Sequence, residues 1–337
     1  MKDNKVFIAI IGILLFIILG IFIVKSFKVK EYTRNYFYMD TYINVKIYSS
    51  SKNKALKALD EIDNIYHTYH DLTDRYNAHE YGLYNLNKNG NSTIDYRLYQ
   101  IINYGYDWYK KSDGLFNIAI GNVTDVWLKY REKGSGVPTK EELVKKSINI
   151  SDVIINEVIT NVSNPKVDSI KLNNGVKIDL GAIAKGYTTD VVADYLKSKG
   201  IKKYIINAGG NVLVGKKVKE SGYKIGIENP TGEGGIYKIV KGEDIAIVTS
   251  GGYNRNYTYD GVTYNHIINP KTLYPANNML SVTVIAKSSK EADALSTTLF
   301  LMDVDKGMEF IKEYDADAIW YLNDGKVITT PGIAKYE

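Results

Sequence analysis

One stretch of the sequence joins a carboxylate, two glycines and a lysine near the start of an expected helix. Residues 177–190 read KIDLGAIAKGYTTD, which predicts a strand ending at Asp179, a glycine turn and a helix from about Ala182. A strand-to-helix junction presents backbone N–H groups to a ligand, and Lys185 is available to neutralise phosphate charge. The segment is neither a Walker loop nor a GxGxxG loop, so a tight turn with a solvated lysine explains it equally well.

A second stretch places a carboxylate and a hydroxyl one helical turn apart. Asp293 and Thr297 are spaced i, i+4, so their oxygens share one face of the helix expected there. Such oxygens suit a hard cation such as Mg²⁺, which also binds substrate phosphate. The alternative is structural: Asp293 favours the N-terminal end of the helix, and Thr297 hydrogen-bonds back to the helix backbone.

The third candidate is a histidine near glycine-rich segments. His67, His70 and His79 fall in a polar helix-to-loop region and are expected at the surface, whereas His266 ends a strand just before a proline turn. Because imidazole titrates near neutral pH, His266 could take a proton from a hydroxyl nucleophile; a core or turn histidine is the alternative. The paired glycines of NAGGN at 207–211 permit close approach of backbone to a ligand, or a plain turn.

Apolar periodicity predicts the elements that position these residues. Helices are expected over 51–69, 94–111, a short segment after Thr139, about 182–198 and 289–301. Strands are expected over 36–48, in a hairpin around 173–175, in short runs over 203–286 and over 316–330. Helices beside runs of antiparallel strands indicate an α+β fold, with mixed or antiparallel sheets flanked by helices.

The composition excludes several classes of protein. Residues 1–34 hold six basic and two acidic residues, and the remaining chain holds 37 basic and 36 acidic residues. A near-neutral body argues against nucleic-acid binding, which needs a clustered basic face. The absence of cysteine excludes disulfides, thiolate metal sites and cysteine nucleophiles.

The N-terminal region contains a long apolar run. Residues 6–24 read VFIAIIGILLFIILGIFIV without a charge, a length that spans ~30 Å of hydrocarbon as a helix. The run is too long for a usual signal peptide and no A-x-A site follows it. We therefore expect a single-pass membrane anchor with a basic linker over 1–34 and one folded domain over 35–337. The flanking charges alone favour a cytoplasmic domain.

Taken together and in this order, these segments resemble the ApbE family of FAD:protein FMN transferases. The resemblance runs from about Met39 to the end of the chain. The matching segments are MDTYINV at 39–45, GLFNIAIGNV at 114–123, IDLGAIAKGYTTD at 178–190, NAGGNVLVGK at 207–216, VTSGGYNR at 248–255, HIINPKTLYP at 266–275, and SVTVIA with ADALSTTLF within 281–300.

The resemblance implies an Mg²⁺-dependent transfer of FMN from FAD to a Thr or Ser hydroxyl of a target protein, with release of AMP. Such targets carry a D-G-x-T-x-A-T-like motif and often belong to membrane redox complexes. Because many relatives act outside the cytoplasmic membrane, the resemblance favours an extracytoplasmic domain at the cell membrane over the flanking-charge count.

The resemblance also implies roles for individual residues. Metal ligation would fall to Asp293, Thr297 and the backbone carbonyl of Ala182, and His266 would assist deprotonation of the hydroxyl. The flavin nucleotide site would be lined by Met39, Tyr76, Leu115, Phe116, Asn117, Asp179, Lys185 and Ile267.

Three residues depart from the family's pattern around the nucleotide pocket. Asn117 replaces the Asp of F-D-P, Asn269 replaces the Asp before the turn proline, and Leu273 replaces the Gly of T-G-Y-P. These changes are expected to alter nucleotide affinity or the balance of transfer against hydrolysis. Two alternatives therefore stay open: an FAD pyrophosphatase that yields FMN and AMP, and a non-catalytic FAD-binding protein.

Overall fold

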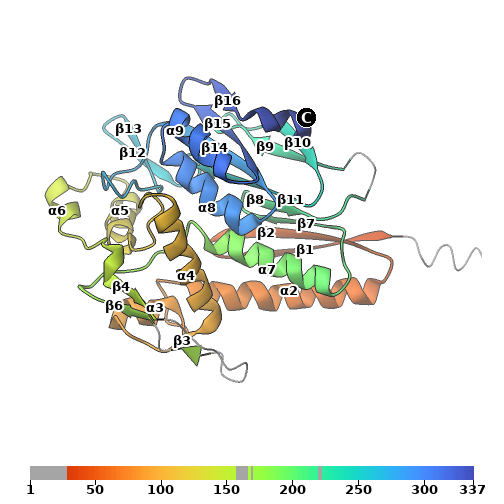
Figure 1. Cartoon of the computed structure of the whole chain (residues 1–337), viewed down its shortest axis with the longest axis horizontal. Helices are drawn as coiled ribbons and strands as arrows, with labels where there is room; N and C mark the ends of the chain where they lie inside the picture. The colour runs from red at the N-terminus through yellow and green to blue at the C-terminus, as the bar shows by residue number, and fades with distance from the viewer. Residues whose placement is uncertain (1–28, 157–165, 168–169, 219–221) are drawn as a thin grey trace, which may run out of the picture.

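An eight-stranded antiparallel sheet forms the centre of the protein (Figure 1). The computed structural model describes residues 29–156, 166–167, 170–218 and 222–337. In spatial order the strands of the sheet are β1 (Lys30–Tyr38), β2 (Thr41–Ser49), β7 (Tyr204–Ala208), β8 (Asn211–Val214), β11 (Ile245–Gly251), β14 (Met279–Ala286), β15 (Ala316–Leu322) and β16 (Val327–Thr329). Every neighbouring pair is antiparallel, so strand starts and strand ends alternate along each end of the sheet.

Both faces of this sheet are covered. The helices α2 (Lys52–Thr73), α7 (Ala184–Ser198) and α8 (Ser289–Phe300) pack on one face and share its largest hydrophobic core (Figure 1). A ribbon of β9 (Tyr223–Glu228) and β10 (Ile236–Gly242) packs on the other face. The near-continuous apolar run of β14 is buried over almost its whole length, as expected for a strand between two layers. The expectation of an α+β fold with an antiparallel sheet flanked by helices is confirmed.

A second group of short elements lies beside the sheet, at the left of Figure 1. It contains α3 (Leu83–Asn89), β3 (Ile94–Asp95), α4 (Tyr96–Lys111), α5 (Gly121–Lys133), α6 (Lys140–Val144), η1 (Ile150–Asp152), β4 (Val153–Ile155), β5 (Lys166–Val167) and β6 (Ile170–Leu172). The hairpin of β12 (Asn256–Tyr259) and β13 (Val262–Asn265) packs against α5, where the Trp127 ring stacks on Tyr264 at 5.6 Å between centroids. The remaining elements are α9 (Val304–Phe310), η2 (Ile311–Glu313) and η3 (Pro331–Tyr336).

Local capping signals predicted several helices correctly. The Thr139 hydroxyl accepts a hydrogen bond from the Glu142 N–H at the start of α6, and Ser288 does the same for the Glu291 N–H at the start of α8. A side-chain oxygen at this position satisfies a backbone donor that the first helical turn leaves unpaired. By contrast, α5 has no counterpart among the predicted helices, because its N-cap residue Ile120 has no side chain that can cap.

Two predictions about strands were wrong. The strand expected over 36–48 is a hairpin, β1 and β2, joined by Met39 and Asp40 at φ of 53° and 58°. Two consecutive left-handed residues form the turn that a two-residue hairpin requires. Here the turn sequence is Met-Asp rather than the Asn-Gly that is typical of such turns. The hairpin expected around 173–175 does not form, because β6 pairs with β4 and residue 177 makes only an isolated bridge to Ile120.

The predicted membrane anchor, Val6–Val24, lies outside the described residues. Strand β1 starts at Lys30, five residues before the domain boundary expected at residue 35, and pairs along its whole length with β2. None of the helices in the described ranges is long and apolar enough to cross a bilayer.

Candidate functional site

The antiparallel topology brings the glycine-rich segments to one end of the sheet. The β1–β2 turn, the β7–β8 turn at Gly209 and Gly210, and the end of β11 all lie at this end. Gly209 has φ +60°, and a Cβ there would overlap the Thr41 side chain, so this turn lies directly against the start of β2. The glycines of NAGGN thus allow close packing of two turns, which is the structural alternative recognised from the sequence.

Arg255 connects the segment after β11 to the β1–β2 turn. Its Nη2 donates a hydrogen bond of 2.8 Å to the Asp40 carbonyl and lies 3.2 Å from the Asp40 carboxylate. Met39, in the same turn, is half-buried, and its N–H donates to His70 Nδ1 at 3.3 Å. His70 and His79 are half-buried rather than on the surface, while His67 is exposed as expected.

Asp293 joins the first turn of α7 to α8. Its side chain is 4% exposed, Oδ2 accepts a 2.8 Å hydrogen bond from the Gly186 N–H, and Oδ1 lies 3.8 Å from Lys185 Nζ. A Cβ on Gly186 would come within 2.6 Å of the Asp293 Cβ, so glycine permits this contact. Burial raises the pKa of Asp293, and the Lys185 charge and the Gly186 N–H oppose that rise.

Oxygen atoms continue along α8 from Asp293. Thr297 Oγ1 lies one turn further, 3.3 Å from Ser250 Oγ, which also contacts Ser296 Oγ at 2.8 Å. Ala182 is half-buried in the turn that precedes α7. In the part of the chain that the structure describes, no group of three or more His, Asp or Glu residues could hold a metal.

The donor set here is one carboxylate with hydroxyl and carbonyl oxygens, all hard ligands. Mg²⁺ is commonly held by one or two carboxylates together with substrate phosphates. The residues therefore fit Mg²⁺ as a metal bound jointly with a phosphorylated substrate, and they do not form a cage that would hold it alone.

His266 is held neutral by its surroundings. Burial, followed by the charges of Arg255, Arg131 and Lys185, lowers the pKa of His266 to about 4. Its Nδ1 is buried, and no group among the described residues hydrogen-bonds to it. At neutral pH the imidazole is therefore uncharged, and the positive charges that lower its pKa favour an anion beside it.

Asp179 is held by a buried arginine that sequence reasoning did not single out. Arg75, with a side chain 7% exposed, pairs with Asp179 and also with Asp125 at 2.6 Å. Asp179 accepts further hydrogen bonds from Thr124 Oγ1 at 2.8 Å and from the Gly181 N–H at 2.9 Å. Although burial opposes ionisation, Arg75 and these hydrogen bonds lower the pKa of Asp179. Through its hydrogen bond from the Gly181 N–H, the Asp179 carboxylate stabilises the turn that leads into α7.

The remaining predicted nucleotide-site residues differ in how far their side chains are available. Tyr76 is 56% exposed. The Arg75 guanidinium carbon lies over the Tyr76 ring, 5.3 Å from the ring centroid. Leu115 is half-buried. Phe116 and Ile267 are only 3% and 8% exposed, because both pack in the main core. These two residues could therefore offer a ligand chiefly their backbone.

Two of the departures from the family pattern, Asn117 and Asn269, make side-chain hydrogen bonds within their turns. Asn117 Oδ1 accepts from the Ala119 N–H at 2.8 Å, and its Nδ2 donates to the Ile148 carbonyl at 3.0 Å. Asn269 Oδ1 accepts from the Lys271 N–H at 2.9 Å. In each case an aspartate oxygen could accept the same bond, so the change to an amide preserves the turn.

Leu273 has a backbone conformation that favours glycine. Its φ is +67°, in the left-handed region, and its carbonyl accepts the Trp127 Nε1–H at 2.8 Å. Leucine at this position costs about 1 kcal/mol of backbone strain.

Known proteins are similar to this chain over most of its length. The model of the ApbE family matches residues 39–320. The FAD:protein FMN transferase of Treponema pallidum is 29% identical over 322 residues, covering 91% of this chain and 88% of that protein. The enzyme of the same name from Klebsiella pneumoniae is 32% identical over 244 residues, covering 70% and 72% of the two chains.

Solved structures share the same fold. The crystal structure of the ApbE protein from Thermotoga maritima superposes with a TM-score of 0.81 at 27% identity, covering 91% of this chain and 99% of that one. The flavin transferase ApbE from Vibrio cholerae has a TM-score of 0.76 at 25% identity, covering 92% and 100%.

Proposed function

The chain belongs to the ApbE family, and we propose that it is the enzyme named by its relatives, an FAD:protein FMN transferase. The observation that carries the proposal is the grouping of Asp293, Lys185 and Thr297 where the start of α7, the middle of α8 and the end of β11 come together, with Lys185 close enough to His266 to help keep it neutral. Positive charge suits the pyrophosphate of FAD, and a neutral base suits the activation of a hydroxyl.

The reaction we propose is a phosphoryl-centred substitution. The hydroxyl oxygen of a Thr or Ser on the target protein forms a bond to the FMN phosphorus, and the phosphoanhydride bond of FAD breaks. AMP leaves with the bridging oxygen, and the hydroxyl proton passes to the imidazole of His266. Since His266 is neutral at pH 7, it has the free lone pair that this step requires.

Residues of this chain would orient and neutralise the nucleotide. Lys185, Arg131 and Arg255 supply the positive charge felt at His266. Met39, Tyr76, Leu115, Phe116, Asn117, Asp179 and Ile267 would complete the flavin site, as the family resemblance implies. A guanidinium or ammonium close to the pyrophosphate favours the charge that the departing AMP carries.

Asp293, Thr297 and the Ala182 carbonyl would hold Mg²⁺. When bound, the metal supplies charge neutralisation at the phosphates. The support for this assignment is the chemistry of the donors and the position of Asp293, buried beside Lys185 at the N-terminal turn of α7.

The target is proposed to be a flavoprotein with a D-G-x-T-x-A-T-like motif, such as a subunit of a membrane redox complex. We further propose a single-pass membrane anchor at residues 6–24 and an extracytoplasmic domain. The support is the uncharged apolar run in the sequence and the family resemblance.

The test uses the full chain in detergent with FAD, Mg²⁺ and a target domain carrying the motif, read by the intact mass of the target. A mass gain of one FMN that requires Mg²⁺ and the acceptor hydroxyl is expected. Asp305→Asn, on the exposed surface of α9, is the matched control for Asp293→Asn. FMN and AMP formed without an acceptor would instead identify a pyrophosphatase, and intact bound FAD would identify a non-catalytic binder.

A further inference from the structure

The end of the sheet opposite the candidate site is rich in lysine. We call it the basic end and define it by the segments 49–54, 197–203, 215–218, 222–224 and 241–244. These segments hold two acidic residues, Glu243 and Asp244. Their ten basic residues are Lys52, Lys54, Lys197, Lys199, Lys202, Lys203, Lys216, Lys217, Lys224 and Lys241.

Hydrogen bonds hold these segments side by side. The Tyr48 N–H donates to the Lys203 carbonyl at 3.0 Å, and the Lys216 N–H donates to the Lys202 carbonyl at 2.7 Å. In the ribbon, Lys224 stands opposite Lys241 across the β9–β10 pair. The lysines therefore form one surface, although they come from segments spread over nearly 200 residues of sequence.

Part of this positive charge is paired locally, and most of the lysines stay exposed. Eight of the ten lysines are exposed, and the other two, Lys203 and Lys217, are half-buried. Asp244 pairs with Lys216, Asp194 lies 3.4 Å from Lys197 Nζ, and Glu243 accepts the Lys217 N–H at 2.8 Å. Because residues 35–337 are almost neutral in total, the excess here must be balanced by negative charge elsewhere on the domain.

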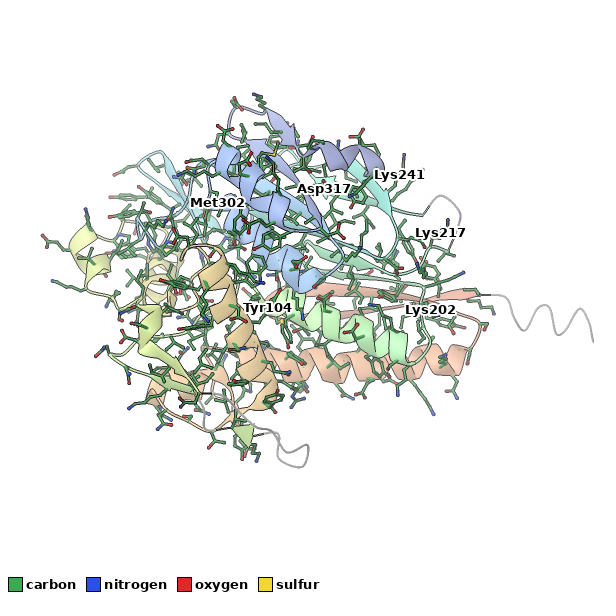
Figure 2. All side chains as sticks on the ribbon, in the orientation of Figure 1. Tyr104, Lys202, Lys217, Lys241, Met302 and Asp317 are labelled. Carbon is green, nitrogen blue, oxygen red and sulfur yellow. The ribbon has the colours of Figure 1, made fainter. Side chains whose placement is uncertain are left out.

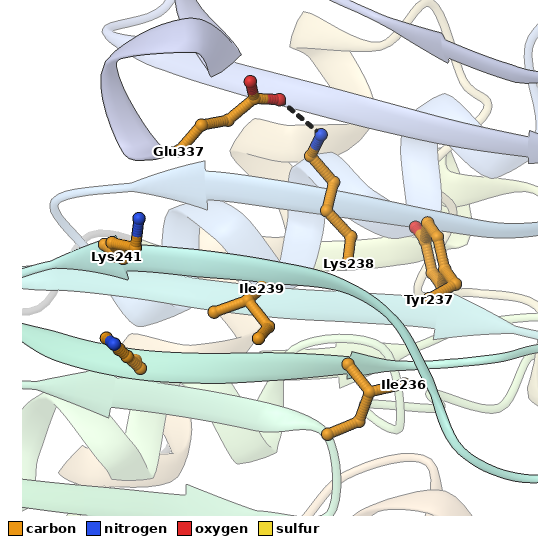
Figure 3. Close-up of a pocket in the computed structure, with 7 residues that line it drawn as sticks. Ile236, Tyr237, Lys238, Ile239, Lys241 and Glu337 are labelled. Carbon is orange, nitrogen blue, oxygen red and sulfur yellow. Dashed lines mark hydrogen bonds and ion pairs between the residues drawn. The ribbon is translucent and has the colours of Figure 1, made fainter.

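Apolar side chains lie next to the basic end. The outer surface of the β9–β10 ribbon has a shallow groove. It is lined by Lys224, Lys241, Tyr237, the exposed Ile236 and Ile239, and the ion pair of Lys238 with Glu337 (Figure 3). Lysines interleaved with exposed aliphatic side chains suit the headgroup region of a bilayer, where charged heads and apolar bodies are both accommodated.

The chain enters the folded domain at this same end. Lys30 starts β1 and stands opposite Ser49 of β2, while the other end of β1 leads into the Met39 turn at the candidate site. Figure 2 shows Lys202, Lys217 and Lys241 on the side of the molecule where β1 begins. Five residues separate the apolar run, which ends at residue 24, from Lys30. Five residues reach at most about 18 Å, so an inserted run keeps this end close to the bilayer.

We propose that the basic end lies on an anionic phospholipid surface and that the candidate site at the other end of the sheet therefore points away from the bilayer. Clustered lysines near a membrane are attracted to anionic headgroups over about one Debye length. The inference rests on the proposed membrane attachment and is independent of the proposed flavin transfer. It implies that the acceptor protein is modified at a distance from the bilayer surface.

The experiment uses the absence of native cysteine, which makes a single introduced cysteine a unique label. Ser198→Cys lies in the basic end, and Asn278→Cys lies just before β14 at the site end; both positions are exposed. Each full-length variant carries a fluorophore and is reconstituted into phosphatidylcholine vesicles, with or without phosphatidylglycerol, that contain a headgroup-spin-labelled quencher lipid. Flotation measures attachment in the same samples.

The probe at residue 198 should lose most of its emission in anionic vesicles, and the probe at residue 278 should keep it. Replacing Lys199, Lys202 and Lys241 with Gln should restore the emission at residue 198, whereas the same change at the exposed Lys140, Lys145 and Lys146 near α6 should not. High salt should also restore the emission at residue 198, because it screens the attraction between lysines and anionic headgroups.

Four results would overturn the inference. Equal quenching of the probes at residues 198 and 278 would show that the basic end does not select anionic lipid. The same conclusion would follow if quenching at residue 198 were the same with and without phosphatidylglycerol. Failure to float with either vesicle would remove membrane attachment while leaving the transfer assay unaffected. Binding of duplex DNA through Lys199, Lys202 and Lys241 without any lipid dependence would assign this surface to nucleic acid.

Discussion

The buried arginine beside the candidate site offers the sharpest test of the structure. We predict that Arg75→Met destabilises the fold chiefly by leaving Asp179, whose side chain is 20% exposed, as an uncompensated and largely desolvated charge. Asp125 keeps a second cation, because Lys177 Nζ lies 2.9 Å from its carboxylate. Asp179 keeps only neutral partners, Thr124 and the Gly181 N–H.

The expected loss at neutral pH is about 3–5 kcal/mol, the usual consequence of removing one partner of a buried ion pair. That is a large share of the roughly 5–15 kcal/mol that stabilises a typical domain. In the wild type the pKa of Asp179 is lowered, so its ionisation stabilises the fold above about pH 4 and this contribution is lost as the pH falls further. Without Arg75 the pKa should rise above its ordinary value, and the sign then reverses: protonating Asp179 stabilises the variant.

The measurement is urea unfolding of residues 29–337, followed by circular dichroism between pH 4 and pH 8. Arg75→Met should gain stability relative to the wild type as the pH falls, and Arg75→Met with Asp179→Asn should recover part of the loss. Arg34→Met is the control, because its pair with Asp60 lies at the surface, with side chains that are 35% and 64% exposed. That variant should lose at most about 1 kcal/mol.

A loss below about 1 kcal/mol for Arg75→Met would refute the reasoning, since it would place Arg75 among ordinary surface pairs. The reasoning would also fail if the double variant were less stable than the single one, because neutralising Asp179 should remove the orphaned charge.

Four further predictions concern the site and its turns. His266→Ala should reduce FMN transfer about 10²–10⁴-fold with a much smaller effect on FAD binding by equilibrium dialysis, and equal losses would contradict a role as base. Because the pKa of His266 in the free enzyme is about 4, kcat/KM should not fall on account of this group until the pH approaches 4; a loss centred near pH 6.5 would count against the surroundings described here. Asp293→Ala should abolish Mg²⁺-dependent transfer while FAD binding without metal persists, and undiminished transfer would exclude Asp293 as a ligand. Gly209→Ala should lower stability in urea by more than Gly232→Ala, since both have positive φ but only the first would overlap Thr41; equal losses of about 1 kcal/mol would show that the turns can separate.

Features set by neighbouring residues could be predicted from the sequence. The caps at Thr139 and Ser288 and the shared helix face of Asp293 and Thr297 depend on residues within one turn of each other. The ordered glycine-rich motifs likewise indicated the family and the segments that form the site. The β1–β2 hairpin was missed because Met39 and Asp40 take left-handed conformations, which cannot be predicted from these two residue types.

Contacts between distant segments could not be predicted in this way. Arg75 reaches Asp179 across 104 residues of sequence, and no local pattern marks it as a partner. His266 could be chosen as a candidate base from its position before a proline turn. Its low pKa, however, comes from burial and from cations on three other segments.

The distribution of charge shows most clearly which properties follow from the sequence and which depend on the tertiary structure. The sequence by itself determined that residues 35–337 are nearly neutral, and that count argued against a nucleic-acid-binding protein. Only the tertiary structure decided where the charges lie, because the antiparallel sheet carries the lysine-rich connections to one end and the glycine-rich turns to the other. A net charge is a sum over the chain, whereas an electrostatic field depends on the distances between charges, and those distances are set by folding.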